Sequence, residues 1–520
     1  MEIYYCNQIK KKTGATAAWS QAPGYAPMLA VSLAPNAVGL YTEEGQPWDP
    51  KKEALVVNVR STECAKMAWH PLLPLLAIGW RDGGISFYNV EERRLEEDSK
   101  THRRPVTHMM WSANGERLIT TDEHGKLAMW KTDRQMRPLH VNSYEEAPGS
   151  TIGVATMGPA PVNESLGTTS CVVFYGVNVQ DTTVLKWAND QGQQGVMEEM
   201  PECATDLIYY AARDQLLVVG VSCTLYLLGR VDQDSPWYPV TEMRFSSGTG
   251  EAALKLQVCW AAEHTLATAS GKDGVVRMYN FETEDNYVIQ VESAEGTPSQ
   301  SPIVCLKSDL RYGMLAAGSA DGRVSVFNYH AHGAHDHPGH AAELSKSWDA
   351  QPAFLVEGPP QLIQWGPNSR LMCVVCDDPK HTYGPTAVSV CRKTLLHQCY
   401  RDGYVVIQSG VDQVLVEQLD AANARPPAKL TLGLQLQGLD MSDRSLLVYG
   451  DKKACVYEVS STGALNQASS FETPSQAMAI SKDSIFRAAD NIIEVCNTSG
   501  GGVLLVCAPQ LLWCTGLACC

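Results

Sequence analysis

Short runs in which hydrophobic and polar positions alternate recur along this chain, with glycine-containing turns between them. The stretch MAWHPLLPLLAIGWRDGGISFYN (67–89) holds three such runs, and MMWSANGERLITTDEHGKLAMWK (109–131) repeats them in other letters. Alternation with a period of two predicts β-strands, and tight turns between the runs predict antiparallel neighbours. Four pairs share one constant offset of 42 residues: Trp69 and Trp111, Gly83 and Gly125, Ile85 and Leu127, and Tyr88 and Trp130. The chain therefore contains one structural unit made more than once.

Five further stretches carry weaker copies of this unit. Their ranges are 17–45, 171–190, 206–232, 259–282 and 305–330. Repeats of about 40–50 residues with four strands each are typical of the blades of WD-repeat β-propellers, which close into rings of about four to eight blades. We therefore expect residues 1–330 to form one closed seven-bladed propeller. Residues 2–6 should pair with its last blade, because closure removes the open sheet edges.

The repeat alignment assigns structural roles to several residues. Four glycines fall where hairpin turns need a positive φ, and we interpret them as turn residues rather than ligand contacts: Gly83, Gly125, Gly274 and Gly322. Trp69 and Trp111 occupy equivalent positions in apolar strands, so both are expected in the core. The segment EERRLEEDSK (91–100) mixes charges of both signs and predicts a solvated loop between two blades.

The strand pattern breaks at residues 331–347, a stretch rich in histidine, glycine and proline that predicts a linker. It restarts within residues 348–520, which contain four further blade-like units: 362–378, 404–420, 436–463 and 476–501. About four blades are too few for a closed seven-bladed ring. The expected fold is all-β, with tandem WD-repeat β-propellers of which the second is incomplete, an open arc of about four blades.

The last residues do not continue a blade cleanly. From Val495 to Cys520 there is no charged side chain. We interpret this apolar end as the truncation of a longer reading frame. Prenylation of the terminal cysteine pair and anchoring by the apolar tail are the alternatives, although the 18 residues from Val503 include Pro509 and make a spanning helix marginal.

Composition narrows the choice of partners and compartment. Lys and Arg number 41 against 57 Asp and Glu, and the net charge of −16 gives no general attraction to nucleic acid or anionic lipid. The 17 cysteines are irregularly spaced, and the start MEIYYCNQIKKK lacks the apolar segment of a signal peptide. The sequence therefore favours a cytoplasmic chain in which reduced cysteines act mainly as small core residues.

No motif for catalysis or cofactor binding is found. A G-x-S-x-G elbow, H-E-x-x-H and a Walker loop are absent, so we expect neither an enzyme nor a cofactor. Five histidines in and beside the linker are weak metal candidates: His330, His332, His335, His337 and His340. A solvated loop explains them better, because a Gly/Pro-rich segment gives no rigid support to metal ligands.

One cysteine motif has a structural interpretation. Cys373 and Cys376 form a C-x-x-C. In an apolar strand, however, residues three apart point to opposite faces. We therefore expect both cysteines to pack in the core rather than to bind zinc or to undergo redox chemistry.

Several segments indicate a protein family as well as a fold. They are MEIYY (1–5), 67–89, EDNYVI (284–289), IVCLKSDLRYGMLAAGSADGRVSVFN (303–328), LIQWG (362–366) and ETPSQAMAI (472–480). In these segments, and in their order, the chain resembles the amino-terminal double-propeller region of the 140-kDa subunit of intraflagellar transport complex A. The resemblance runs over the chain to about residue 500.

This resemblance implies a non-enzymatic scaffold that supports retrograde ciliary transport and the ciliary entry of membrane-protein cargo. The implied partners are other complex A subunits, tubby-like adaptors and membrane-protein cargo, at the cilium or flagellum, the basal body and the cytoplasm. In the family a helical solenoid follows the propellers, and no helical repeats follow them in this sequence. A vesicle-coat or other interaction scaffold is the alternative, since coat subunits also pair two propellers with a solenoid.

Overall fold

The computed structural model describes residues 2–507 apart from 10–12, 34–35, 50–54, 60, 134, 159–161, 164–167, 170, 212, 232–234, 246–254, 294–296, 331–346, 378–386, 411–412, 420–426, 435, 451–452, 461–463, 474, 476, 490–491 and 502–503. The regular elements of this part are β-strands, and none of it forms a helix long and apolar enough to cross a membrane. The chain divides into two compact units, one of Cys6–Arg392 and one of Met1–Tyr5 with Lys393–Cys520.

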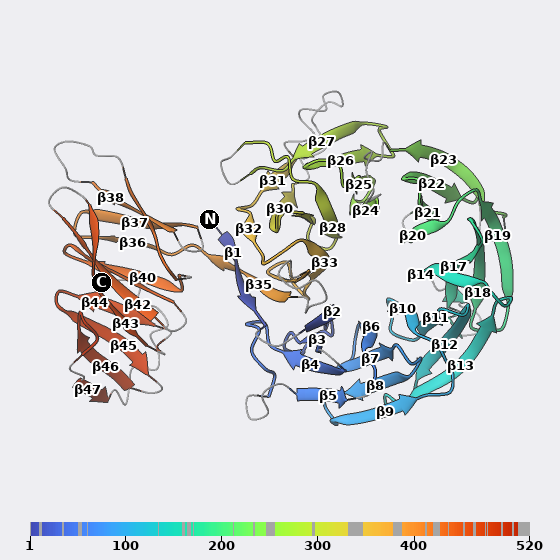
Figure 1. The fold of residues 1–520 in the computed structure, drawn as a ribbon, viewed down its shortest axis with the longest axis horizontal. Helices are drawn as coiled ribbons and strands as arrows, with labels where there is room; N and C mark the ends of the chain where they lie inside the picture. Colours follow the sequence, from blue (N-terminus) through green and yellow to red (C-terminus); the bar gives the residue numbers. More distant parts are fainter. Residues whose placement is uncertain are drawn as a thin grey trace. The chain divides into compact units, whose positions relative to one another are not determined.

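The larger unit is a ring of β-sheets (Figure 1). Its described residues form eight antiparallel sheets of four or five strands, and we number these blades one to eight in chain order. One edge strand of each sheet faces the centre of the ring, and the opposite edge lies at the periphery (Figure 1). Because the chain passes from the periphery of one blade to the centre of the next, all innermost strands run in the same direction.

The strands of blades one to four are β2 (Thr13–Trp19), β3 (Leu29–Leu33), β4 (Ala37–Tyr41) and β5 (Leu55–Val59); β6 (Cys64–Trp69), β7 (Leu75–Trp80), β8 (Ile85–Asn89) and β9 (Arg94–Asp98); β10 (Val106–Trp111), β11 (Leu118–Asp122), β12 (Lys126–Thr132) and β13 (Pro138–Glu145); β14 (Thr151–Met157), β17 (Val172–Val179), β18 (Thr182–Asn189) and β19 (Gln194–Met200). A small hairpin of β15 (Val162–Asn163) and β16 (Thr168–Thr169) lies between β14 and β17 in the chain.

The strands of blades five to eight are β20 (Ala204–Tyr210), β21 (Gln215–Gly220), β22 (Thr224–Gly229) and β23 (Tyr238–Arg244); β24 (Gln257–Ala262), β25 (Thr265–Ala269), β26 (Val275–Asn280) and β27 (Asn286–Gln290); β28 (Ile303–Asp309), β29 (Met314–Ser319), β30 (Arg323–Tyr329), β31 (Trp348–Ala350) and β32 (Phe354–Leu355); β33 (Pro360–Trp365), β34 (Leu371–Cys376), β35 (Ala387–Leu395) and β1 (Glu2–Gln8). The segment 94–98, expected as part of a solvated loop, is the outer strand of blade two.

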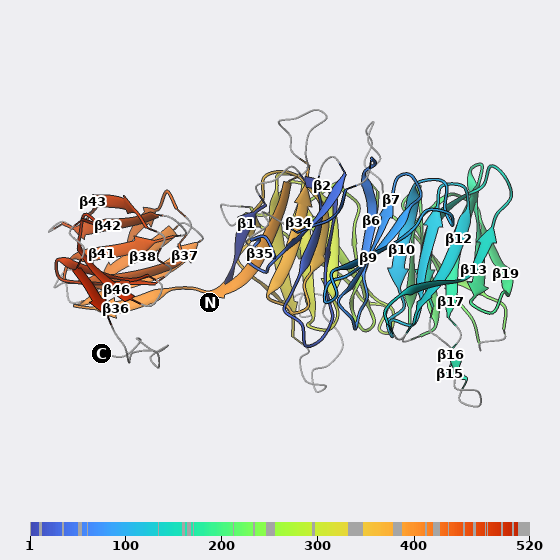
Figure 2. The same ribbon diagram turned by 90° about the horizontal axis from the view of Figure 1, so that it is seen from below.

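The N-terminal strand closes the ring. β1 completes the sheet of β33, β34 and β35, and Figure 2 shows β1 and β2 beside β34 and β35. Ile9 N–H donates to Val388 O at 2.9 Å, and Cys6 Sγ lies 2.7 Å from Cys391 Sγ. From Ile9 to Cys6 the position moves back along the chain, while the partner residue moves forward from Val388 to Cys391. The two segments therefore run antiparallel. The pairing protects an edge that would otherwise remain open.

The expected seven blades and the expected boundary at residue 330 are both wrong. The described residues of the ring form eight sheets, and the unit continues to Arg392. Residues 331–346 lie outside the described residues, but β30 before them pairs with β31 after them. The described residues on both sides of the histidine-rich stretch therefore belong to blade seven, so the stretch is an insertion within one blade and not a linker between domains. Such an insertion is tolerated because the cost of loop closure grows slowly with length.

Buried side chains fill the space between neighbouring blades. Trp69, Leu76 and Trp80 of blade two belong to one cluster with Leu40 of blade one. At the point of closure, a second cluster joins side chains of blades eight and one: Leu371, Val375, Val388, Ile9, Trp19 and Leu29. Burial of apolar side chains is the main favourable contribution to folding. Each blade is therefore stabilised by the two blades beside it.

A tryptophan at the end of the innermost strand also links blades through a hydrogen bond. The indole Nε1 donates to a backbone carbonyl of the preceding blade in three pairs: Trp69 to Ala18 at 2.9 Å, Trp111 to Ala68 at 3.2 Å, and Trp365 to Lys307 at 3.1 Å. Innermost strands have no partner strand on the side of the ring axis, so these carbonyls need another donor. The repeated bond satisfies them and sets the spacing of the blades.

The four turn positions require glycine for two different reasons. Gly83, Gly125 and Gly322 have φ of 87°, 77° and 85°, the region that side chains rarely adopt. Gly274 has no such φ, but a Cβ there would lie 2.4 Å from Ser299 O. At that turn glycine is required by the close approach of another backbone segment rather than by its own conformation.

The smaller unit contains three sheets in its described residues. Its strands are β36 (Gln398–Arg401), β37 (Tyr404–Gly410), β38 (Gln413–Gln418) and β39 (Ala428–Thr431); β40 (Gly438–Ser442), β41 (Ser445–Tyr449), β42 (Lys453–Val459) and β43 (Leu465–Glu472); β44 (Met478–Ser481), β45 (Ser484–Ala489), β46 (Ile492–Asn497) and β47 (Leu504–Cys507). The first of the four units expected in the second domain, 362–378, belongs instead to the ring. The apolar end was expected from Val495 to Cys520 and not to continue a blade, but its first part contributes to the paired strands β46 and β47, as far as Cys507. Residues 508–520 lie outside the described residues.

Replacement of the bridging tryptophans should destabilise the ring. Trp69 is buried and Trp111 half-buried. We expect Trp69→Ala and Trp111→Ala each to lower the free energy of unfolding by about 3–5 kcal/mol through cavity formation. Trp69→Phe keeps a ring but removes the N–H donor and should cost less, about 1–2 kcal/mol.

Urea unfolding of the full chain followed by circular dichroism measures these differences. The exposed Lys100 lies beyond the end of β9, and Lys100→Ala is the control. A loss for Trp111→Ala no larger than the loss for Lys100→Ala would contradict the alignment of the blades.

Candidate functional site

One end of the ring is formed by the turns that join each innermost strand to the second strand of its blade. We call this end the hairpin face. Its described turns comprise residues 20–28, 70–74, 112–117, 211 and 213–214, 263–264, 310–313 and 366–370. Connecting loops on a rigid scaffold are the usual place for binding residues. The hairpin face is therefore the first candidate for a functional surface.

Polar side chains hold neighbouring turns of this face together. Arg311 Nη1 in blade seven donates to Gln21 Oε1 in blade one at 2.8 Å. The other terminal nitrogen of Arg311 donates to Gly366 O in blade eight at 3.2 Å. Tyr25 OH donates to Glu91 Oε1 at 2.7 Å and so joins blade one to blade two. These bonds tie four consecutive blades on both sides of the closure, so the turns there are positioned as one rigid group.

Large apolar side chains stand exposed on the same sector. Tyr25 and Leu72 have exposed fractions of 39% and 48%, and Leu310 and Tyr312 of 51% and 44%. Single exposed apolar side chains are common on protein surfaces. A sector that combines several of them with fixed turns has the composition of a protein-binding surface, in which aromatic and aliphatic groups act as anchors.

A cavity lies farther along the hairpin face, where blades five, six and seven meet. Its volume is about 520 Å³, and it is lined by Tyr209, Tyr210, Ala211, Trp260, Ala261, Ala262, Glu263, Leu310, Gly313 and Tyr329. Four of these residues are aromatic, and Glu263 is the one charged residue among them. A space of this size fits a side chain together with a short length of backbone.

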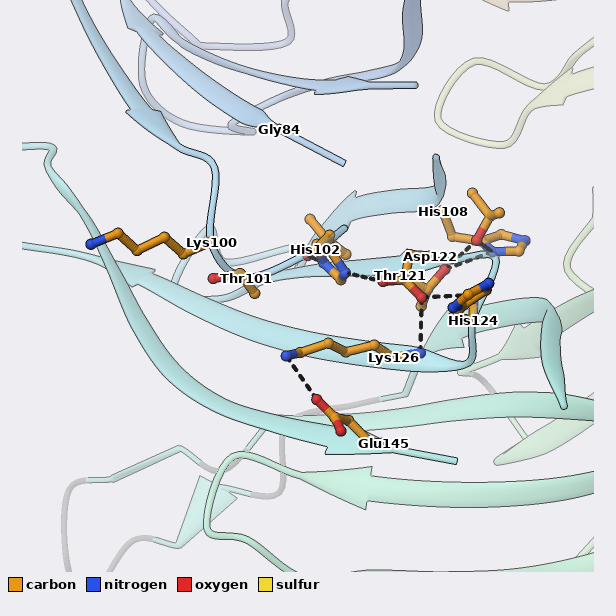
Figure 3. Close-up of polar contacts among 12 residues, drawn as sticks. Gly84, Lys100, Thr101, His102, His108, Thr121, Asp122, His124, Lys126 and Glu145 are labelled. Carbon is orange, nitrogen blue, oxygen red and sulfur yellow. Dashed lines mark hydrogen bonds and ion pairs between the residues drawn. The ribbon is translucent and has the colours of Figure 1, made fainter. Parts of the chain in front are cut away.

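A buried polar network in blade three has the form of a catalytic arrangement. His102 Nδ1 lies 2.9 Å from Asp122 Oδ2, and His102 Nε2 lies 2.8 Å from Thr120 Oγ1. Trp130 Nε1 donates to the same hydroxyl oxygen at 2.9 Å. Figure 3 shows His102 reaching Asp122, whose carboxylate also accepts the N–H groups of His124 and Lys126. Hydroxyl, imidazole and carboxylate thus lie in the order that a nucleophile, its base and an orienting group require.

The burial of this network gives it a structural role. Thr120, His102 and Asp122 are exposed by 0%, 1% and 2%, so no substrate reaches the hydroxyl. Burial raises the pKa of Asp122, but hydrogen bonds from His102, Lys126 and His124 outweigh it and hold the pKa below its usual value. Each polar group has a partner, as buried groups require. The network therefore fastens the strands of blade three to the segment before β10.

His108 lies on the innermost strand of the same blade. Its Nδ1 is 2.9 Å from Thr121 Oγ1. Burial, together with the charges of Lys66 and Lys255 and against the opposing charge of Asp206, lowers the pKa of His108 to about 4. The imidazole is therefore neutral at pH 7, and two lysines and an aspartate from other blades act on it electrostatically. Sequence reasoning missed this group because it depends on the register of four different blades.

The residues expected to bind metal or to pack in the core are placed as follows. Cys373 and Cys376 lie on β34 and are fully buried. Of the five linker histidines only His330 falls within the described residues, where its Nε2 lies 3.0 Å from Asp349 Oδ2; His332, His335, His337 and His340 lie outside them. No group of three or more His, Cys, Asp or Glu side chains in the described part of the chain is arranged to hold a metal ion.

Four-stranded blades closed into a ring, with hydrogen bonds from tryptophans between them, define this chain as a WD-repeat β-propeller protein. A family model described as the IFT140 first beta-propeller matches residues 3–166 and 164–378, and a model described as the IFT140 second beta-propeller matches residues 402–502. These matches cover most of the chain, and the chain belongs to the IFT140 family. The first model extends past residue 330, in agreement with a ring that includes β33 and β34.

Solved structures support the fold alone. The chain is similar to "Structure of Dos1 propeller" at 10% identity and a TM-score of 0.51, covering 74% of this chain and 93% of that one. The "Crystal Structure of Mitotic Checkpoint Complex" is similar at 13% identity and a TM-score of 0.41, covering 75% of this chain and 90% of that one. The first similarity agrees with a propeller, and the second is too distant to add to it.

His108 should make the stability of the ring depend on pH. The unfolded chain takes up a proton near pH 6.5, whereas folded His108 does so only near pH 4. The contribution of neutral His108 to the free energy of unfolding is therefore complete above pH 6.5 and is lost as the pH falls toward 4. Because the side chain is only partly buried, we expect a loss of about 1–2 kcal/mol between pH 7 and pH 5.

Urea unfolding at the two pH values measures this loss. His108→Gln retains a polar partner for Thr121 without a titrating group and should reduce the loss by that amount. His124→Gln, in an exposed turn of the same blade, is the control. An undiminished loss in His108→Gln would show that other groups cause the pH dependence.

Proposed function

We propose that this chain is a non-enzymatic scaffold subunit of intraflagellar transport complex A. In this role it supports retrograde ciliary transport and the ciliary entry of membrane-protein cargo. Its partners are other complex A subunits, with tubby-like adaptors and cargo as further partners, at the cilium or flagellum and its basal body and in the cytoplasm. Membership in the IFT140 family supports this assignment.

The observation that carries the scaffold role is the sector of the hairpin face around the closure. Its turns are held by Arg311 and Tyr25, and it exposes Leu72, Leu310 and Tyr312. Docking on fixed turns loses little conformational entropy, and exposed anchors supply apolar contact. The buried Thr120–His102–Asp122 network contributes to the fold and offers no open catalytic site.

Affinity purification of the tagged full chain from ciliated cells, with quantitative mass spectrometry, tests the proposal. We expect recovery of complex A subunits and tubby-like adaptors. The double variant Leu72→Asp/Tyr312→Asp places charges in the apolar sector and should reduce recovery at least about fivefold. Val196→Asp alters an apolar side chain on the outer strand β19 that is more exposed than either, and it should not reduce recovery.

Two results would contradict the proposal. Recovery of vesicle-coat subunits in place of complex A subunits would favour the alternative scaffold. Equal recovery with the double variant and with Val196→Asp would show that the hairpin face is not the docking surface.

A further inference from the structure

The tryptophan bridge made by Trp69, Trp111 and Trp365 is not repeated between blades five and six. Trp260 pairs with Leu266 as Trp69 pairs with Leu76, so the two indoles occupy the same register position. Tyr210 of the preceding blade, however, stacks on Trp260 with ring centroids 4.0 Å apart and an interplanar angle of 20°. The indole therefore lies against an aromatic ring instead of donating to a carbonyl.

This arrangement leaves two polar atoms unpaired. Trp260 Nε1 and Tyr210 OH have no hydrogen-bond partner among the described residues, although the side chains are only 5% and 6% exposed. The indole of Trp19 at the point of closure is also unpaired. The pair of Trp260 and Tyr210 differs from it because both residues line the 520 Å³ cavity. Both atoms have almost no accessible surface, so they form part of the cavity wall and do not themselves contact a ligand.

The charges around the cavity select the ligand. Glu263 lines it and has a side chain exposed by 78%. His264 Nε2 lies 3.9 Å from Glu263 Oε1 and 3.5 Å from Glu282 Oε2, and the Glu282 side chain is exposed by 61%. Both carboxylates raise the pKa of Tyr210 after burial, against the opposing charge of Arg213. The field at the hydroxyl is therefore negative on balance, and it disfavours an anionic ligand.

We propose that this cavity binds an arginine or lysine side chain of a partner polypeptide. The cation lies among the aromatic side chains of Tyr209, Tyr210, Trp260 and Tyr329, where cation–π attraction operates. Glu263 accepts its N–H groups in a charge-assisted hydrogen bond.

Other ligands use these groups less well. A carboxylate would face Glu263, and a purely apolar side chain would make no use of the charge of Glu263. The cavity is large enough for a long side chain with its adjoining backbone. It lies next to Leu310 of the apolar sector, so a segment seated in it continues onto the surface proposed for docking. The inference thus deepens the scaffold role by naming the chemistry of a bound segment.

Short peptides with a single central change test the proposal on the full chain. The probes are acetyl-Gly-Ser-X-Ser-Gly-amide peptides in which X is arginine, lysine, citrulline or norleucine. Citrulline keeps the shape of arginine without its charge, and norleucine does the same for lysine. The methyl resonances of Leu310 report binding in titrations followed by nuclear magnetic resonance, because Leu310 lines the cavity.

We expect saturable shifts with the arginine and lysine peptides, and at least about fivefold weaker binding of their neutral counterparts. Glu263→Gln should weaken the arginine peptide about fivefold without changing thermal unfolding, since the side chain is exposed. Glu116→Gln, in the corresponding turn of blade three, is the control. Equal binding of arginine and citrulline, no effect of Glu263→Gln, or no saturable shift up to about 10 mM peptide would overturn the proposal.

The peptide titration and the affinity purification together separate this inference from the scaffold role on which it rests. If wild-type chain recovers no complex A subunits but still binds the arginine peptide, the scaffold role fails and the cavity assignment stands. If complex A subunits are recovered but no peptide charge dependence is seen, the cavity assignment alone fails.

Discussion

A row of propeller blades buries all of its blade faces only when the first and the last blade meet, and this chain meets that requirement with its own N-terminus. Residues 6–9 pair with residues 388–391 of β35, and Ile9 enters the same buried cluster as Leu371 and Val388. Without this pairing, a sheet edge and two apolar blade faces would be exposed to water. The positions of the other blades, and of the turns between their strands, depend on it.

Closure also determines where partners can dock. The turns next to it are joined by Arg311 and Tyr25, and the apolar side chains exposed there are held in fixed places. Farther along the ring, Trp260 stacks on Tyr210 instead of donating to a carbonyl, and both residues line an aromatic cavity. The same position of the innermost strand thus links neighbouring blades through a hydrogen bond in three blades and lines a cavity in another.

The repeat made much of the first ring predictable from sequence. The constant spacing located Trp69 and Trp111, and the glycine turns at Gly83 and Gly125 have the positive φ that a hairpin needs. The eighth blade was assigned to the second domain because an insertion precedes it, and strand pairing across an insertion leaves no local signal. The outer strand 94–98 was missed because it is polar, as solvent-facing strands commonly are.

The candidate site could not be predicted in the same way. Its cavity depends on Tyr210 stacking on Trp260, two residues separated by 50 positions in the sequence. The contact with Leu310 and Tyr329 follows only from the order of blades in the ring. Nothing in the individual segments distinguishes these aromatic residues from the core residues of the other blades.

Closure by the N-terminal strand is the central claim, and cysteine cross-linking tests it most directly. Cys6 and Cys391 have sulfur atoms 2.7 Å apart. Brief treatment of the reduced full chain with diamide, followed by peptide mapping, should yield a disulfide between Cys6 and Cys391, and Cys6→Ser should abolish it. Pairing of Cys6 with a different cysteine, or alkylation of Cys6 as fast in the folded chain as in urea, would contradict the closed eight-bladed ring.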